Sequence, residues 1–196
     1  MNQPLNKISR ILIMIASLAL CSAYVTPLWQ ILMWAPQYPE GLEMKIWINT
    51  LTGNIKIISA LNHYIGMAHI EVSMFPEFKY MIYIVGVIIL IGLFSTLINR
   101  RWSLLVFFFS LGAAGLAALV DFYLWGYKYG HNLNPDAPIK VPGMVYQPPL
   151  IGTKQLLNFT AFSGPDIGGW VFIVVAVMVF TLLVLEQFYF KKNDPQ

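Results

Sequence analysis

Long apolar runs alternate with two mixed segments along this chain. Apolar character dominates residues 11–33, 80–98, 102–125 and 170–190. About 20 apolar residues in a helix are enough to cross the ~30 Å hydrocarbon core of a bilayer. The pattern therefore predicts an all-α membrane protein with four transmembrane helices, in a single membrane domain that covers residues 1–196.

The first apolar run has features of a secretory signal, because Lys7 and Arg10 precede it and Ala23 ends a short stretch of small residues. The run continues beyond Ala23 and is longer than the apolar core of a signal peptide. We therefore expect an uncleaved anchor. Pro27 is expected to kink its outer end, since proline removes a backbone donor and clashes with the preceding turn.

Composition makes lipid the expected solvent. The chain is 58% hydrophobic and 11% charged, whereas soluble domains carry roughly 25% charged residues. The net charge of +3 comes without a basic stripe interleaved with aromatic residues, so no nucleic-acid partner is expected. Cys21 is the single cysteine, which excludes an internal disulfide framework and a CxxC metal or redox motif.

The cations predict the orientation of the spans. Half of the lysines and arginines lie in three short stretches next to span ends, namely Lys7, Arg10, Arg100, Arg101, Lys191 and Lys192. Short loops rich in lysine and arginine stay in the cytoplasm. We therefore expect a multi-pass protein of the bacterial inner membrane with both termini cytoplasmic.

The two remaining segments, residues 34–79 and 126–169, are then extracytoplasmic, and we expect them to form an ordered cap. In the first, residues 61–70 read as a short amphipathic helix that rests on the membrane or on the bundle. The second is expected to be an irregular lid packed on the first, because it contains Pro135, Pro138, Pro142, Pro148, Pro149 and Pro165. Ordered loops on a rigid scaffold commonly carry function.

All three histidines fall in these outer segments, together with several methionines. On a helix, His63 and Met67 share one face, and Glu71 continues that face. An imidazole beside a thioether suits copper. His69 can join them only if the helix breaks at Gly66. The alternative is that Met67 fills a gap in packing and His63 bonds a neighbouring loop.

Further candidate ligands follow in the second outer segment and in the third span. His131 and Asp136 either bind the metal or form a pair in which Asp136 orients the imidazole. The competing interpretation is an asparagine-rich turn. Met144 lies in a turn that would expose its sulfur. Asp121 lies inside an apolar run, where it either pairs with Lys128, holds a proton or reaches an ion.

Enzyme signatures are absent from the sequence. It contains no GxxxxGK[ST], GxGxxG, HExxH or GxSxG string. The predicted spans hold no histidine that could bind a buried haem, and CxxCH is missing. We therefore expect no haem and a protein without enzymatic activity, with copper as the candidate cofactor.

Three strings carry a resemblance to a known group of proteins: LNHYIGM at residues 61–67, KVPGM at residues 140–144 and PPLIG at residues 148–152. They resemble small uncharacterised bacterial inner-membrane proteins associated with the gene clusters of nitrous oxide reductase and its copper-accessory proteins. The resemblance covers most of the chain. It implies a role in denitrification beside a periplasmic copper enzyme or its accessory proteins.

The expected function is therefore an inner-membrane accessory protein that handles copper or supports the maturation of a periplasmic copper enzyme such as nitrous oxide reductase. Its partners would be the bilayer and a periplasmic or membrane protein. Two alternatives remain open. One is a membrane subunit of a quinol-oxidising or electron-transfer assembly, and the other is a scaffold that anchors a partner without binding metal.

Overall fold

A computed structural model describes residues 3–140, 143, 145–156 and 158–188. Its longest elements are four helices that pack side by side. α1 contacts α3 and α5, and α4 contacts the same two helices. A 3₁₀ segment, η1 (Leu20–Tyr24), prolongs the first helix, and the four helices are α1 (Lys7–Ala19), α3 (Phe78–Ile98), α4 (Arg101–His131) and α5 (Ile167–Phe188).

All four helices, α1 being counted together with η1, are long and apolar enough to cross a membrane. Their outward faces carry large exposed apolar side chains, such as Leu97, Phe109 and Phe188. Exposed apolar surface of this extent is favourable when lipid tails cover it. The chain is therefore a membrane protein, and its helices are suited to direct lipid contact.

The prediction of an all-α fold is wrong, because the outer segments form a five-stranded antiparallel sheet. Its strands run in the order β3-β2-β1-β5-β4. Two shorter helical elements, α2 (Ile55–Tyr64) and the 3₁₀ turn η2 (Val72–Met74), follow the third strand. The strands are β1 (Trp29–Ala35), β2 (Tyr38–Ile46), β3 (Leu51–Gly53), β4 (Gly152–Leu156) and β5 (Phe159–Pro165).

The first predicted span, residues 11–33, joins two different structures. Helical geometry ends at Tyr24, just before Pro27, and Trp29 starts the central strand β1. Ile31 of this strand pairs with Met44 of β2 on one side and with Ser163 of β5 on the other. The sequence did not predict this strand because apolar side chains occupy both of its faces. Its residues therefore extend the apolar run of the helix before it.

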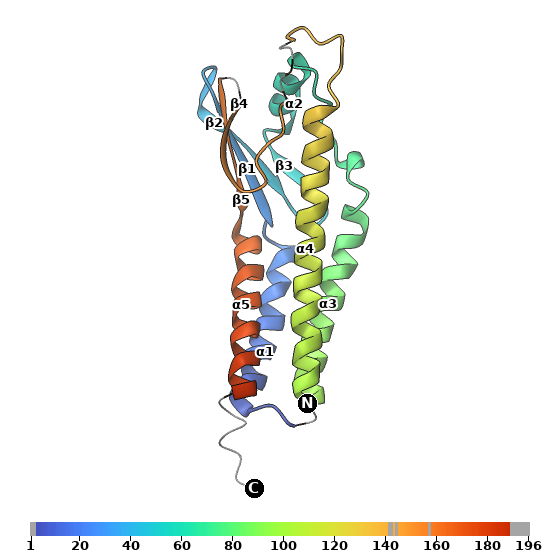
Figure 1. Ribbon diagram of the computed structural model, residues 1–196, viewed down its shortest axis with the longest axis vertical. Coiled ribbons are helices and arrows are strands. Elements are labelled where there is room, and N and C mark those ends of the chain that lie inside the picture. Colours follow the sequence, from blue (N-terminus) through green and yellow to red (C-terminus); the bar gives the residue numbers. More distant parts are fainter. Residues whose placement is uncertain (1–2, 141–142, 144, 157, 189–196) are drawn as a thin grey trace.

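Figure 1 shows the sheet and α2 together at one end of the bundle, beside the end of α4, and opposite the start of α1. We call this part the head: the sheet, α2 and residues 125–131 of α4. A helix of 31 residues at 1.5 Å per residue is about 46 Å long, which exceeds the ~30 Å hydrocarbon core. The helix that contains the third predicted span, residues 102–125, is therefore longer than the hydrocarbon core, and its last residues belong to the head.

The segment after α4 packs against the first outer segment through backbone hydrogen bonds. The amide of Asn134 donates to Gly66 (2.7 Å), and the amide of Ile139 donates to Tyr64 (2.9 Å). These bonds fix the end of α2 to the chain that leaves α4. The two outer segments thus form one folded unit.

A buried ion pair joins the helices at the opposite end of the bundle. Arg101 Nε lies 3.2 Å from Glu186 Oε2, and the Glu186 side chain is 2% exposed. The other carboxylate oxygen accepts the Asn6 amide at 2.8 Å. Breaking a buried pair on one side leaves an uncompensated charge, which typically costs about 3–5 kcal/mol. These contacts therefore hold the start of α1, the start of α4 and the end of α5 together.

Candidate functional site

The end of helix α2 forms a sharp turn that brings two histidines together. The Asn62 carbonyl accepts the amides of Ile65 (3.2 Å) and Met67 (3.0 Å), which ends the helix. Gly66 adopts φ +87°, a conformation that glycine reaches without steric cost. The chain then returns beside α2. The rings of His63 and His69 stack with centroids 5.2 Å apart and 19° between their planes.

Hydrogen bonds on both sides of His69 hold it in this position. The carbonyl of Ala68 accepts the Tyr129 hydroxyl at 2.8 Å. The amide of Ile70 donates to the Ser59 hydroxyl at 3.0 Å. Because both neighbours of His69 are tied to buried side chains of α4 and α2, its place opposite His63 is set by the core of the head.

His63, Met67 and His69 line one surface hollow of about 350 Å³, and residues 132–134 form its other wall. We call it the histidine hollow. Both histidines are exposed, whereas Met67 is 6% exposed and lies at the base. The three side chains thus line one cavity. The expectation that His63 and Met67 share one face of a helix is wrong, because α2 ends at Tyr64.

The two stacked rings are close enough to chelate one metal ion, but their nitrogens do not yet point at a common position. Metal–imidazole bonds of about 2.0–2.1 Å place two ligand nitrogens no more than about 4 Å apart. Parallel rings direct their lone pairs side by side, so rotation of one exposed ring is needed to aim both nitrogens at one ion. Two imidazoles with a thioether below them form a mixed ligand set suited to copper.

The other predicted histidine does not join this pair. The His131 ring stacks on Tyr127 at 3.8 Å, and its Nδ1 lies 2.8 Å from the Tyr127 carbonyl. Nδ1 therefore carries the proton that it donates to this carbonyl. In the part of the chain that the structure describes, Asp136 makes no hydrogen bond to this ring. Instead, Asn134 Oδ1 accepts the Asp136 amide at 2.9 Å, the geometry of the asparagine turn.

Two predicted acidic candidates lie elsewhere. Glu71 lies beyond the turn, where its carboxylate accepts a hydrogen bond from the Ser73 hydroxyl at 3.1 Å. Asp121 is exposed on α4 beside Glu77, and none of the ion pairs between described residues joins it to Lys128. Partial burial and the nearby Asp121 carboxylate raise the pKa of Glu77. The predicted ligand Met144 lies outside the described residues.

Among the described residues, no three or more histidine, cysteine, aspartate or glutamate side chains gather into a group that could hold a metal ion. A metal in the histidine hollow must therefore complete its coordination with the Met67 thioether, with backbone or asparagine oxygens, or with a ligand from outside the chain. Structural metal sites are usually closed by four protein ligands, so this ligand set does not fit an ion whose role is to stabilise the fold.

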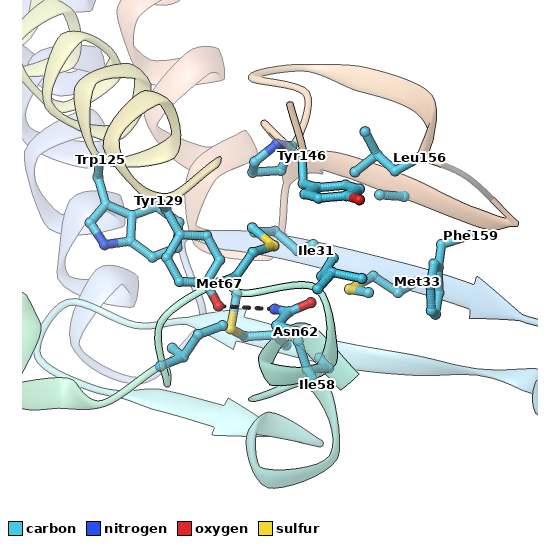
Figure 2. A pocket seen from close by; sticks show the side chains of 15 residues that line it. Ile31, Met33, Ile58, Asn62, Met67, Trp125, Tyr129, Tyr146, Leu156 and Phe159 are labelled. Carbon is cyan, nitrogen blue, oxygen red and sulfur yellow. Dashed lines mark hydrogen bonds between the residues drawn. The ribbon is translucent and has the colours of Figure 1, made fainter. Parts of the chain in front are cut away.

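Behind the hollow lies a second cavity, the apolar pocket, of about 50 Å³. It runs between the sheet, α2 and α4, and Figure 2 shows Trp125 at one end of it and Phe159 at the other. Asn62 Nδ2 donates to the Tyr129 hydroxyl at 2.9 Å along its wall. Met67 lines this pocket as well as the hollow, so one side chain separates the two cavities.

The apolar pocket was not predicted, although parts of its signal were present. The alternation of Leu42, Glu43, Met44, Lys45 and Ile46 is typical of a strand with one buried face, and Met44 lines the pocket. Trp125 and Tyr129 are one helical turn apart and stack at 4.7 Å. The pocket is completed by the pairing of segments that are distant in the sequence, and no local sequence pattern predicts that pairing.

Comparisons with protein-family models, with curated proteins and with solved structures find no match to this chain. Its function must therefore be inferred from the geometry of the head and from the chemistry of the side chains that line its cavities.

Proposed function

We propose that this protein is a non-enzymatic copper-handling protein of the bacterial inner membrane, with its head on the periplasmic side. The observation that carries the proposal is the stacked pair of His63 and His69 at the rim of a hollow that Met67 also lines. Nitrogen ligands accept both oxidation states of copper, and a thioether favours Cu(I).

The distribution of cations supports the proposed orientation. Lys7 and Arg10 lie at the start of α1, and Arg100 and Arg101 join α3 to α4, all at the end of the bundle opposite the head. Positively charged short loops remain in the cytoplasm. The head, with its two exposed histidines, is then open to the periplasm.

The proposed partner is a periplasmic copper enzyme such as nitrous oxide reductase, or one of its copper-loading proteins. Support comes from the resemblance carried by residues 61–67, 140–144 and 148–152, and from the open coordination of the hollow. An ion held by few ligands of this chain can gain further ligands from a docking partner, and those ligands can then draw it away. The role is therefore delivery or maturation, with no covalent chemistry.

Copper binding to the purified protein tests this proposal. We expect His63→Ala and His69→Ala each to weaken Cu(I) binding at least tenfold in competition with a colorimetric chelator. His131→Ala is the matched control, because its ring stacks on Tyr127 away from the pair, and it should bind as the unmodified protein does. X-ray absorption of the loaded protein should show sulfur scattering that disappears in Met67→Leu, which keeps the apolar volume.

Equal affinity in the two single variants and the unmodified protein would remove the ligand assignment. Loss of copper binding in His131→Ala alone would show that copper binds at His131 and not in the histidine hollow. The quinol-assembly alternative predicts instead that quinone is retained when the protein is purified. A pure scaffold predicts that all three histidines are dispensable for binding the partner and for its activity.

A further inference from the structure

Helix α4 loses contact with the rest of the bundle over the half of its membrane span next to the head. Its buried residues end at Leu111 and resume only at Gly126. At 1.5 Å per residue, the stretch between them is about 21 Å long, roughly two-thirds of the hydrocarbon core. The other membrane helices keep buried residues in this half, such as Val85 of α3 and Val175 of α5. Residues 112–125 are therefore only loosely covered by the described part of the chain.

Small side chains dominate the first half of this stretch. Residues 112–118 read GAAGLAA. Exposed positions elsewhere in the bundle carry large side chains, such as Leu97 on α3 and Phe180 on α5. Lipid tails cover large and small side chains alike, whereas a second helix approaches closely only where the side chains are small. The composition therefore favours a helix over lipid as the neighbour of this stretch.

One face of the stretch combines small residues with a carboxylate. We call it the alanine face, and its residues follow one another at helical spacings of three and four, namely Ala114, Ala117, Ala118 and Asp121. The last three of them are exposed. The opposite side of α4 carries Leu116, which is 65% exposed. The large side chain suits lipid, and the alanine face suits a closer neighbour.

Asp121 brings negative charge to this face without a compensating cation. None of the ion pairs between described residues includes Asp121 or the neighbouring Glu77. Partial burial and the Asp121 carboxylate raise the pKa of Glu77, the effect expected when two acids lie together. Asp121 lies about 6 Å along the helix from Trp125, towards the bilayer centre. An ionisable group at such a depth is costly unless it is paired, so the face requires a positive charge there.

A second copy of this chain does not supply that charge. In a two-fold contact the same patch faces itself. Two copies inserted in the same direction would therefore set Asp121 against Asp121 if their alanine faces met. Like charges repel, and they do so more strongly in lipid than in water. The lysine that α4 itself offers, Lys128, lies about 10 Å further along the helix axis.

We propose that the alanine face binds a transmembrane helix of a partner protein that carries a lysine or arginine at the depth of Asp121. The alanines let the two backbones approach, and the cation pairs with Asp121 and Glu77. The partner helix covers α4 where this chain covers it least. The proposal does not depend on copper binding, since it uses a different part of the molecule.

Crosslinking to a synthetic helix tests this proposal. The probe is an apolar peptide of about 24 residues with a tryptophan near each end. It carries one lysine a helical turn inside one tryptophan, and one cysteine a turn deeper. The matched peptide has leucine in place of the lysine. Each peptide is reconstituted in phosphatidylcholine vesicles with the full-length protein in a Cys21→Ser background, carrying either Ala118→Cys on the alanine face or Leu116→Cys on the opposite side.

Disulfide yields after mild oxidation decide the outcome. We expect Ala118→Cys to crosslink the lysine peptide about tenfold more than the leucine peptide. Adding Asp121→Asn, which keeps the size of the side chain, should lower the yield to that of the leucine peptide. Leu116→Cys is the control and should crosslink both peptides equally.

Two results overturn the proposal. Equal yields of the two peptides at Ala118→Cys would leave lipid as the cover of the alanine face. A disulfide between two protein chains at Ala118→Cys, formed in preference to the peptide crosslink, would assign the face to a second copy.

Discussion

Gly66 determines whether the two ligand candidates of the head can meet. Its φ of +87° lets the chain reverse after α2. A Cβ atom built on Gly66 would lie 2.9 Å from the Asn134 carbonyl oxygen and 3.1 Å from the Asn134 nitrogen. These are backbone atoms that cannot rotate away. The distance between His63 and His69 therefore depends on a residue that contributes no side chain.

We predict that Gly66→Ala weakens metal binding and lowers stability by more than backbone strain alone. Left-handed backbone costs a residue with a Cβ roughly 1–2 kcal/mol, and here the contact with Asn134 adds to that cost. Gly152→Ala is the matched control, because Gly152 also has positive φ (+94°) but faces open space. Thermal unfolding in nanodiscs should show the larger loss for Gly66→Ala, and chelator competition should show weaker copper binding only there. Equal losses in both variants would argue against a structural role for the Asn134 contact.

At the scale of elements, the helices were predictable and the sheet was not. Twenty apolar residues in sequence have few alternatives to a transmembrane helix, and four such helices are present. Strand β5 has no comparable pattern. Its inward positions include Ala161 and Ser163, whereas Phe162 lies on the opposite face, so polarity does not alternate with burial. Such a strand is specified by its pairing with β1, more than one hundred residues earlier, and not by its own residues.

A disulfide across the β1–β5 pair tests this arrangement. Leu32 and Phe162 are register partners, and paired positions in antiparallel strands lie about 4.5–5.5 Å apart between Cα atoms. This separation lies within the range that a disulfide bridges. In a Cys21→Ser background, Leu32→Cys with Phe162→Cys should oxidise to an internal crosslink that mass spectrometry detects. Leu32→Cys with Lys154→Cys is the mismatched control, because Lys154 pairs with Ala161, and efficient crosslinking there would contradict the register.

At the scale of the whole molecule, the head and the charged helix ends lie on opposite sides of the bundle (Figure 1). The apolar runs and the cations predicted this separation, because both outer segments leave the bilayer at the same end. What they could not predict is that α4 continues into the head, where it forms one wall of the apolar pocket, and that residues 132–134 directly after it line the histidine hollow. There Tyr129 packs into one buried cluster with Ile31 and Met44 of the sheet, which is a tertiary effect.

Cysteine labelling in intact cells checks the proposed topology. Lys56 lies on α2 in the head and Lys7 at the start of α1, and both are exposed. In a Cys21→Ser background, the proposed orientation predicts that Lys56→Cys reacts with a membrane-impermeant maleimide added to cells whose outer membrane has been permeabilised, because the reagent then reaches the periplasm. Lys7→Cys should react only after the cells are lysed. The reverse pattern would place the head in the cytoplasm and end the proposal of a periplasmic copper partner.

The central position of β1 has a consequence for biogenesis. β2 can pair with this strand soon after both are synthesised. The other edge of β1 stays unpaired until β5 is made, after residues 36–158 have been translated. At 5–20 residues per second, translation of that interval takes roughly 6–25 s. During this time a nascent three-stranded half-sheet presents unpaired amides and carbonyls, a state prone to pairing with other chains. Chaperones that shield strand edges on the far side of the membrane would therefore raise the yield of this protein more than factors that assist insertion of its helices.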